Sequence, residues 1–317
     1  MAYFFTEDEV GRLLTMEDAV SAVEAAFREL SQEQAVNRPR VRVRLPGVML
    51  HVMPAGSQKL DRLGLKAYTA TREGARFLFL LYARETGELL SVMEADRLGQ
   101  IRTGAATGVA TRYMSQPDAA TVGIYGTGWQ ARSQLQAVAV VRRLREVVAF
   151  GRDEERRKKF CDEMSDALGV EVRPASSPKE VAEGADIVIT ATTAREPVLL
   201  GEWLRPGQHI NAIGSNFAKK REVDDEVVQR AAVIAVDSKE QALLECGDLL
   251  APISAGAMSW DNVHELADIV AEKTLGRSDS DDITLFESQG LAIQDVAVAH
   301  RVFEIGRAQG LGVPLPF

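Results

Sequence analysis

The residues with the clearest chemical meaning form a glycine-rich segment near the middle of the chain. Residues 126–131 match the pattern G-x-G-x-x-A, follow an apolar strand expected over 121–125 and open an expected helix. Gly126 permits a tight turn, Gly128 lets the backbone approach a ligand, and Ala131 keeps helix and strand close. Because a helix N-terminus offers free N–H groups to an anion, this segment predicts a dinucleotide pyrophosphate site. The alternative is a glycine turn in a protein that binds no nucleotide.

The residues after the next strand indicate which dinucleotide is bound. An NAD site usually has an acidic residue there, which accepts a hydrogen bond from the ribose 2′-hydroxyl. The strand expected over 147–150 is followed instead by Gly151, Arg152 and Asp153. Arg152 can pair with a 2′-phosphate, Gly151 leaves room for it, and Asp153 is suited to cap the following helix. We expect NADPH to be preferred and NADH to be possible; the alternatives are an exposed Arg152 or an Asp153 that reaches the ribose.

Basic residues among the first hundred or so positions are candidates for holding a substrate acid. Arg102 precedes a run of small residues expected to be helical, and an arginine beside a helix N-terminus is a natural anion site. Lys66 lies in an otherwise apolar strand, where it either extends its ammonium group to solvent or has a function. Arg40, Arg42 and Arg44 share one face of an expected strand, and the residues alone do not choose among them.

The histidines and cysteines do not form a recognisable metal or disulfide motif. None of the four histidines has metal-ligand spacing, and Cys161 and Cys246 lie far apart without a CxxC pattern. We therefore expect no metal and a reduced, cytoplasmic setting. His51 remains a candidate for the substrate cleft, because it shares a strand face with Met49 and Met53.

The composition excludes several classes of protein. The chain has 317 residues, 46% hydrophobic and 26% charged, which suits a globular protein of two domains. A net charge of −9 argues against nucleic acid as a partner. No apolar run approaches the length of a membrane-spanning helix, and the acidic first residues do not resemble a signal peptide. We expect neither nucleic acid nor membrane as a partner.

The expected elements change in character at about residue 113. Before it, capping signals at Thr6 and Thr15 predict two helices. Strands follow over 40–45, 48–53, 64–68 and 77–82. After it, strands alternate with helices, as the strands over 121–125, 147–150, 186–191, 209–213 and 233–236 and the helices over 130–143 and 154–168 indicate. A further apolar helix is expected from 291 to 303. Alternation predicts an α/β fold with a doubly wound parallel sheet, preceded by an α+β region.

Together these motifs resemble the ornithine cyclodeaminase/mu-crystallin family over essentially the whole chain. The segments that carry the resemblance are Val52–Ala55, Gly64–Lys66, Ile101–Ala106, Gly126–Ala131, His209–Gly214, Ile283–Ser288 and Gly290–Ala297. The family includes ornithine cyclodeaminases, archaeal alanine dehydrogenases, ketimine reductases, pyrroline-2-carboxylate reductases and thyroid-hormone-binding mu-crystallins. The resemblance therefore indicates a family rather than one activity.

The resemblance implies two domains with different binding roles. Residues 114–290 would form a Rossmann-type dinucleotide-binding domain, and 1–113 with 291–317 a substrate-binding domain that dimerises. Arg40, Lys66 and Arg102 would hold the substrate carboxylate, with His51 nearby, and Lys66 and Arg102 would also serve catalysis. The expected cofactor contacts are Gly126, Thr127, Gly128, Trp129, Gln130, Ala131, Gly151, Arg152, Thr192, Ser288 and Gly290.

One departure from the family pattern bears on the reaction. Cyclodeaminases have an aspartate shortly after the strand expected over 209–213, and Asn216 occupies its place here. An amide cannot act as a carboxylate base at neutral pH, nor stabilise a cationic amine by charge. We therefore expect the simple half-reaction, reduction of a preformed C=N bond beside a carboxylate. Asn216 would then be a catalytic residue that orients substrate or water; the alternative is that it only packs its loop.

The sequence thus predicts an NADPH-dependent reductase of 2-imino acids, with cyclic ketimines such as Δ1-pyrroline-2-carboxylate as the expected substrates. Lys66 would polarise the site or donate a proton. The expected partners are a small imino or amino acid and a second copy of the chain. One alternative is an ornithine cyclodeaminase or an alanine or N-alkyl amino-acid dehydrogenase. The other is a non-catalytic, NADPH-gated small-ligand-binding protein of mu-crystallin type.

Overall fold

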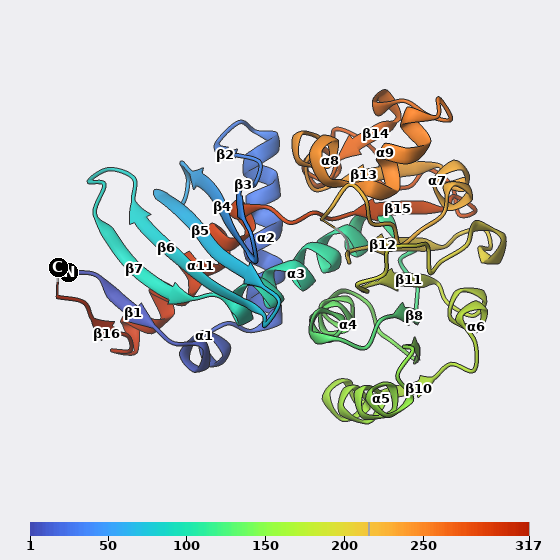
Figure 1. Cartoon of the computed structure of the whole chain (residues 1–317), viewed down its shortest axis with the longest axis horizontal. Helices are drawn as coiled ribbons and strands as arrows, with labels where there is room; N and C mark the ends of the chain where they lie inside the picture. The colour runs from blue at the N-terminus through green and yellow to red at the C-terminus, as the bar shows by residue number, and fades with distance from the viewer. Residues whose placement is uncertain (215, 317) are drawn as a thin grey trace. The chain divides into compact units, whose positions relative to one another are not determined.

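The computed structural model describes residues 1–214 and 216–316. The chain folds into two compact units. Unit 1 comprises Met1–Ala105 and Gly290–Phe317, the blue, cyan and red parts of Figure 1, and unit 2 comprises Ala106–Gln289. The first boundary expected from the sequence, at residue 113, lies near the end of helix α3 (Asp96–Met114), whereas the units divide inside that helix. Ser215, the residue before Asn216, lies outside the described residues.

Unit 1 is built on a mostly antiparallel sheet whose central strands follow one another in the sequence. These strands are β4 (Val48–Ser57), β5 (Arg62–Thr71), β6 (Ala75–Ala83) and β7 (Leu89–Glu94). At one side of the sheet, β7 pairs with β1 (Tyr3–Phe5), and β1 pairs with β16 (Val313–Pro314). At the other side, β4 pairs with both β2 (Ala35–Asn37) and β3 (Val41–Leu45). The expected strands are all present, and short turns between neighbours explain their antiparallel pairing.

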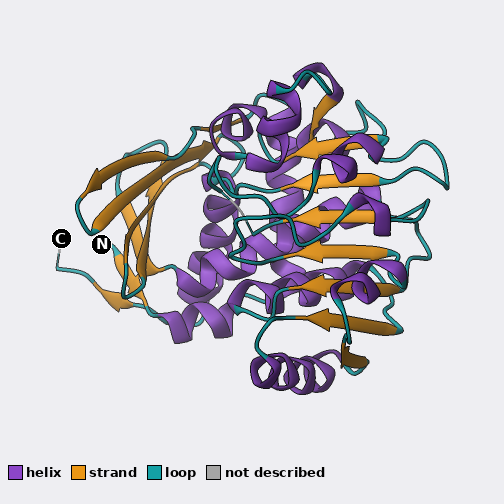
Figure 2. Ribbon diagram, turned by 45° about the vertical axis from the view of Figure 1, so that its right-hand side comes forward, coloured by secondary structure: helices purple, strands orange, loops and turns teal. Residues whose placement is uncertain are grey.

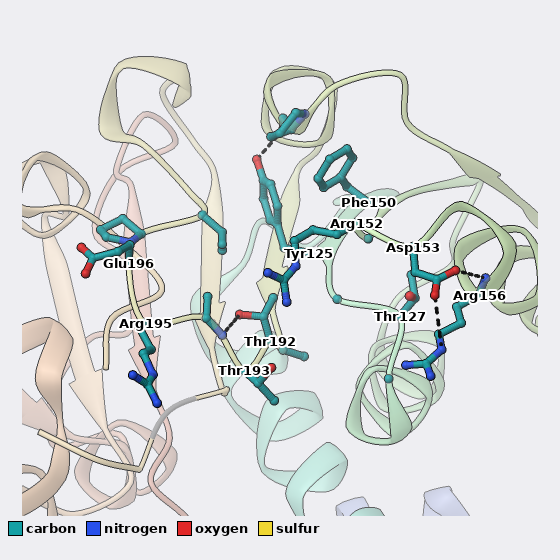
Figure 3. Close-up of a pocket in the computed structure, with 18 of the residues that line it drawn as sticks. Tyr125, Thr127, Phe150, Arg152, Asp153, Arg156, Thr192, Thr193, Arg195 and Glu196 are labelled. Atoms are coloured by element: carbon teal, nitrogen blue, oxygen red, sulfur yellow. Dashed lines mark hydrogen bonds and ion pairs between the residues drawn. The ribbon is translucent and has the colours of Figure 1, made fainter. Parts of the chain in front are cut away.

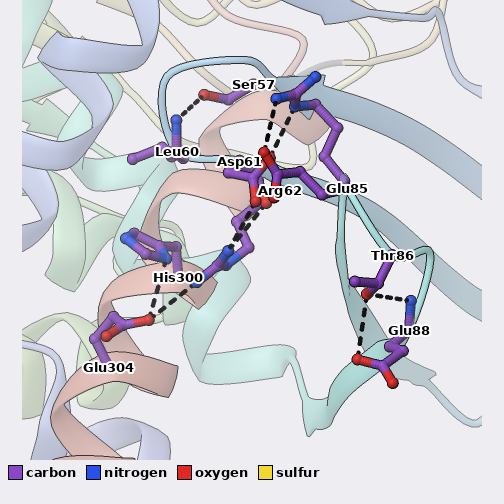
Figure 4. Close-up of polar contacts among 10 residues, drawn as sticks. Ser57, Leu60, Asp61, Arg62, Glu85, Thr86, Glu88, His300 and Glu304 are labelled. Atoms are coloured by element: carbon purple, nitrogen blue, oxygen red, sulfur yellow. Dashed lines mark hydrogen bonds and ion pairs between the residues drawn. The ribbon is translucent and has the colours of Figure 1, made fainter.

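The helices of unit 1 begin where the capping signals predict. Thr6 forms a capping box at the start of α1 (Glu7–Leu13), and Thr15 caps α2 (Met16–Ser31). Helix α11 (Ala292–Ala308) packs against α2 and against β4 and β5, with most of its first half buried. An ion pair of 3.1 Å between Arg62 on β5 and Glu304 fastens the far end of α11 to the sheet (Figure 4). The C-terminal helix thus completes the core of the N-terminal sheet.

Unit 2 contains a parallel sheet, which confirms the predicted fold class. Its strands, in spatial order, are β10 (Glu171–Pro174), β9 (Glu146–Phe150), β8 (Thr121–Tyr125), β11 (Ile187–Thr190), β12 (His209–Ala212), β15 (Thr284–Glu287), β13 (Val233–Val236) and β14 (Val263–Glu265). Every neighbouring pair in this order is parallel. The order runs outward from β8 to β10 on one side and from β11 to β12 on the other. Such a reversal is the point at which doubly wound sheets bind ligands.

Helices cover both faces of this sheet, because successive residues of a buried strand point to opposite sides (Figure 2). Ile187 and Ile189 pack in one core with α4 (Trp129–Val141) and α5 (Glu154–Leu168), whereas Val188 belongs to the other core. The second core includes residues of α6 (Pro178–Glu183), α7 (Asp225–Arg230), α8 (Lys239–Glu245) and α9 (Gly247–Ser254). Shorter helices are α10 (Leu266–Val270), η1 (Gly201–Trp203) and η2 (Trp260–Asn262). Within the described residues, no helix is long and apolar enough to cross a membrane.

Candidate active site

A pocket of about 1440 Å³ opens where β8, β9 and β11 end, at the point where the strand order reverses (Figure 3). The turns that follow these strands supply much of its lining. Of the expected cofactor contacts, those that line the pocket are Gly126, Thr127, Gly128, Gly151, Arg152 and Thr192. The pocket also contains Arg195, which the sequence analysis missed although it lies shortly after a buried strand. Its position and glycine-rich lining suit a dinucleotide.

The three glycines that line this pocket differ in what a β-carbon would contact at each position. Gly126 has φ +102°, and a β-carbon there would lie 2.3 Å from the carbonyl oxygen of Ala191. A β-carbon on Gly151 would lie 2.7 Å from the hydroxyl of Thr127. At Gly128, in contrast, a β-carbon would meet no described atom within 4 Å. The protein's own packing requires the first two, whereas the absence of a side chain at Gly128 keeps free a space that a ligand can enter.

The first turn of α4 presents the remaining residues of the glycine-rich motif. Gly128 is the N-cap of α4 and offers no side chain to the first N–H groups, which suits an anion at this end of the helix. Trp129 is partly exposed, and Gln130 is half-buried. Ala131 is fully buried in the core between the sheet and α4 and α5, where its small side chain keeps helix and sheet close.

The two residues that bear on cofactor choice have different surroundings. Asp153 is the N-cap of α5: its Oδ1 accepts a hydrogen bond of 3.0 Å from the backbone N–H of Arg156, as predicted, and its Oδ2 lies 3.5 Å from the Arg156 side chain (Figure 3). The Arg152 side chain lines the pocket, is exposed, and has no polar partner among the described residues. The acid is therefore engaged by its own helix, while Arg152 is available to an anion.

A buried carboxylate orders the loops after β11 and β12. Glu222 accepts hydrogen bonds from the hydroxyl of Thr190 at 2.9 Å, from the hydroxyl and N–H of Thr192 at 2.6 Å each, and from the N–H of Gly214 at 2.6 Å. Burial raises the pKa of Glu222 despite these bonds. Thr192 thus reaches the pocket in a fixed orientation. Glu222 could not be predicted from the sequence, because it belongs to no recognised motif.

Three other expected site residues lie outside the lining of this pocket. Ser288 follows β15, and its hydroxyl donates a 3.0 Å hydrogen bond to Asp237. Asn216 is half-buried in the segment after β12. Gly290 belongs to unit 1 and has φ +82°, and a β-carbon there would lie 2.6 Å from Nη1 of Arg102. The positive φ and the nearby guanidinium group of Arg102 therefore both explain why glycine occupies this position.

A cluster of buried charges in unit 1 brings together two of the expected catalytic residues. Lys66 on β5 places its Nζ 2.9 Å from Oδ1 of Asp295, and the Nε of Arg102 on α3 lies 3.3 Å from the same oxygen. The side chains of Lys66, Arg102 and Asp295 are 3%, 8% and 0% exposed. Nη1 of Arg102 also donates a 2.8 Å hydrogen bond to Gln294. Lys66 is therefore not a lysine that extends to solvent.

The electrostatics of this cluster leave Lys66 easy to deprotonate. Burial lowers the pKa of its ammonium group to about 8; Asp295 opposes that shift, whereas Arg102 and Arg40 add to it. A glycine on α3 makes the geometry possible, because a β-carbon on Gly99 would lie 2.5 Å from the lysine Nζ. A lysine with a pKa near neutrality can both hold a proton and give it up.

Arg40 and His51 belong to the same unit and lie near this cluster. Arg40 precedes β3 and is 7% exposed; its Nε contacts Sδ of Met53 at 3.3 Å, and Met53 is paired with Lys66 in the register of β4 and β5. Of the other two arginines, Arg42 is half-buried and Arg44 exposed. The structure thus separates three residues that the sequence pattern treated alike.

His51 forms part of an aromatic wall across the sheet. Its ring stacks on Tyr68 with centroids 4.2 Å apart, and Tyr68 stacks on Phe77 at 4.7 Å. Burial lowers the pKa of His51 to about 4, and Arg40, Arg42 and Arg44 reinforce the shift. A neutral imidazole in this wall can contact a flat ligand but cannot supply charge. Among the described residues, no three His, Cys, Asp or Glu side chains are arranged to hold a metal ion.

Comparison with known proteins gives the family. The model of the ornithine cyclodeaminase/mu-crystallin family matches residues 2–310. Alanine dehydrogenase of Archaeoglobus fulgidus is 35% identical, over 98% of this chain and 97% of the relative, and Δ1-pyrroline-2-carboxylate reductase of Bacillus cereus is 32% identical, over 98% of each.

Solved structures agree over the whole chain. That of Thermococcus litoralis Δ1-pyrroline-2-carboxylate reductase, in complex with NADH and L-proline, is 36% identical with a TM-score of 0.95 and covers 99% of this chain and 100% of that one. An archaeal alanine dehydrogenase dimer with bound NAD is 33% identical with a TM-score of 0.94, over 100% and 99%. The chain therefore belongs to the ornithine cyclodeaminase/mu-crystallin family.

Proposed function

We propose that the protein is a nicotinamide-dependent reductase of 2-imino acids, with cyclic ketimines such as Δ1-pyrroline-2-carboxylate as substrates. The observation that carries the proposal is the buried cluster of unit 1, where Lys66 and Arg102 meet with Arg40 close by. Buried cations of this kind suit a small carboxylate. The relatives that reduce Δ1-pyrroline-2-carboxylate, and the similar structure that holds NADH and L-proline, support the same chemistry.

The residues of this chain take distinct parts in the proposed reaction. Arg40 and Arg102 hold the substrate carboxylate, and their positive charge disfavours a cationic side chain beside it. When bound, the reduced nicotinamide supplies the hydride that adds to the imine carbon. Lys66 gives a proton to the imine nitrogen, so that C=N becomes CH–NH and the lysine regains its proton from water. Asn216 orients substrate or water without carrying charge.

We propose NADPH as the preferred form of the cofactor, bound in the pocket of unit 2. Arg152 lines that pocket without a polar partner among the described residues, and Asp153 is engaged as a helix cap. A guanidinium group in this place can pair with a 2′-phosphate, whereas the carboxylate of Asp153, at the position where an NAD site has its acidic residue, already accepts from the N–H of Arg156. Unit 2 is accordingly the dinucleotide-binding domain, and unit 1 the substrate-binding domain.

We also propose that unit 1 forms a homodimer. Strand β3 lies at the edge of the sheet and exposes Val41, Val43 and Leu45 by 57%, 53% and 63%. Exposed apolar side chains on an edge strand favour pairing with another surface. The archaeal alanine dehydrogenase of similar structure is a dimer. Sedimentation at micromolar concentration should give a single species of twice the chain mass, and a monomer there would contradict this assignment.

Oxidation of NADPH and NADH tests the proposed function directly. The substrates are Δ1-pyrroline-2-carboxylate, its six-membered homologue, and pyruvate with ammonia. We expect fastest turnover with a cyclic imino acid and NADPH. Preference for pyruvate with ammonia would favour an alanine dehydrogenase, and ammonia release from ornithine with NAD would favour a cyclodeaminase. Saturable NADPH binding without consumption on any of these would instead indicate a ligand-binding protein.

A further inference from the structure

Asp295 is a buried carboxylate whose position neither helix capping nor a surface ion pair explains. It lies in the first turn of α11, fully buried, and it was assigned no role from the sequence. Its Oδ1 lies within 2.9 Å of Lys66 Nζ and 3.3 Å of Arg102 Nε, so one oxygen faces two cations. Its Oδ2 is buried without a hydrogen-bond partner among the described residues. The acid is thus directed at the two residues proposed for catalysis.

The cost of such an arrangement indicates that it serves more than stability. Removing a carboxylate from water is expensive, and a buried ion pair is often no more stabilising than apolar side chains of similar volume. The second oxygen of Asp295, Oδ2, is buried without a hydrogen-bond partner among the described residues, which stability alone would disfavour. What the carboxylate does provide is a fixed geometry for two long, flexible side chains.

We propose that Asp295 is a positioning residue of the imine reduction: by facing both cations with one buried oxygen, it fixes the ammonium group of Lys66 beside the guanidinium group of Arg102. The residue is fully buried, so it acts through these two side chains and not on the substrate. The inference rests on the proposed function and adds to it a residue from the C-terminal helix.

The charges around Lys66 determine what the loss of Asp295 would do. The groups that face the lysine are Asp295 from α11, Arg102 from α3 and Arg40 from the segment before β3, and the neutral ring of Phe77 on β6 lies 5.4 Å from its Nζ. The nearby His51 on β4 is uncharged at neutral pH. Without the carboxylate, burial and both arginines would all lower the pKa of Lys66. The lysine would then lose its proton at a lower pH than in the wild type.

The test compares Asp295→Asn, which keeps the volume and removes the charge, with Asp295→Glu and with Glu304→Gln as a control on the same helix. Asp295→Asn should lower kcat/KM for the best imino acid at pH 7 by about tenfold or more, since a pKa one unit below the assay pH leaves about a tenth of the lysine protonated. The alkaline limb of its pH profile should move to lower pH. Asp295→Glu should recover part of the activity, and Glu304→Gln should match the wild type. An unmoved pH profile for Asp295→Asn would overturn the proposal.

Two further measurements keep the outcome unambiguous. In a Lys66→Gln background, Asp295→Asn should lower kcat/KM by less than it does in the wild type, because only the contact with Arg102 remains to be lost; an effect as large as in the wild type would overturn the positioning of Lys66. The pH dependence of L-proline binding, measured by calorimetry, reports Lys66 without turnover. If no imino acid is reduced, the proposed function fails, yet a binding profile that Asp295→Asn shifts to lower pH would still support the positioning role. If Asp295→Asn does not fold, the profile of Asp295→Glu decides, because an unchanged limb with a displaced carboxylate would contradict the role.

Discussion

The two candidate binding regions differ in whether their basic side chains already contact a carboxylate of the protein. In the pocket of unit 2, the backbone turns are fixed, yet Arg152 has no polar partner among the described residues and Gly128 faces open space. In unit 1, Lys66 and Arg102 are buried and already face Asp295. The first region is prepared for a large ligand that brings its own phosphates. In the second region the charges are already held by one another, which suits the small carboxylate that we propose as its ligand.

This contrast predicts that changes in unit 1 affect turnover and pH dependence, whereas changes in unit 2 affect cofactor affinity and selectivity. It also predicts different effects on stability. Removing one member of a buried charge cluster leaves the other charges uncompensated and lowers stability. Removing a solvent-facing arginine leaves no buried charge without a partner, so stability should change little.

The largest effect is expected for Arg102→Ala. Loss of the guanidinium group removes the proposed substrate contact and leaves Asp295 with Lys66 alone, so kcat/KM should fall by roughly 100-fold or more. Dinucleotide affinity, measured by fluorescence titration, should stay close to that of the wild type. Wild-type kcat/KM in this variant would remove Arg102 from its assigned role, and Arg40→Ala tests the second arginine in the same way.

The matched pair Gly126→Ala and Gly128→Ala separates packing from ligand binding within unit 2. Gly126→Ala places a β-carbon 2.3 Å from a carbonyl oxygen at φ +102°, and should destabilise the protein by about 1–3 kcal/mol. A β-carbon at Gly128 meets no atom of the described residues within 4 Å, so Gly128→Ala should cost less stability than Gly126→Ala, limited to the weaker capping by alanine, while dinucleotide affinity should fall by roughly tenfold. Unchanged affinity in Gly128→Ala would mean that no pyrophosphate lies against this backbone.

Arg152→Ala sharpens the distinction between the two cofactors. A charge-assisted, bidentate contact is worth about 1.5–3 kcal/mol, so NADPH should bind roughly tenfold more weakly or worse and NADH nearly as before. Both dissociation constants should be measured at one salt concentration, since ionic strength screens an exposed guanidinium group. An equal loss for both cofactors would reject Arg152 as the phosphate ligand.

The smallest effect is expected for Asn216→Asp, which adds a titratable group at nearly constant volume. If Asn216 faces the reacting imine, the pH profile of kcat should change shape, and a trace of ammonia could be released from ornithine. An unchanged profile would assign the residue to loop packing. Clear ornithine cyclodeamination by the wild-type protein would contradict the argument, because that chemistry would then proceed without the carboxylate.

Elements with strong local signals could be predicted from the sequence almost to the residue. The strands Thr121–Tyr125 and Val233–Val236 and the helix Glu154–Leu168 match their predicted bounds, because continuous apolar runs and a capping aspartate are local properties. Strands β2 and β7 are among those that were missed. Each is held by neighbours elsewhere in the sheet rather than by a distinctive pattern of its own.

The dinucleotide loop and the basic candidates were determined by the sequence itself, since residue type and local spacing are enough to recognise a phosphate-binding turn or a cation in an apolar strand. The family resemblance grouped Arg40, Lys66 and Arg102, but only the tertiary structure showed that Lys66 and Arg102 share a buried carboxylate. Lys66 and Asp295 are 229 positions apart, and no periodicity connects them. Arg40, Arg42 and Arg44 look alike in a strand pattern, yet burial distinguishes the first. Burial and long-range pairing depend on how the chain packs. A local sequence pattern does not specify which distant residues a side chain will contact.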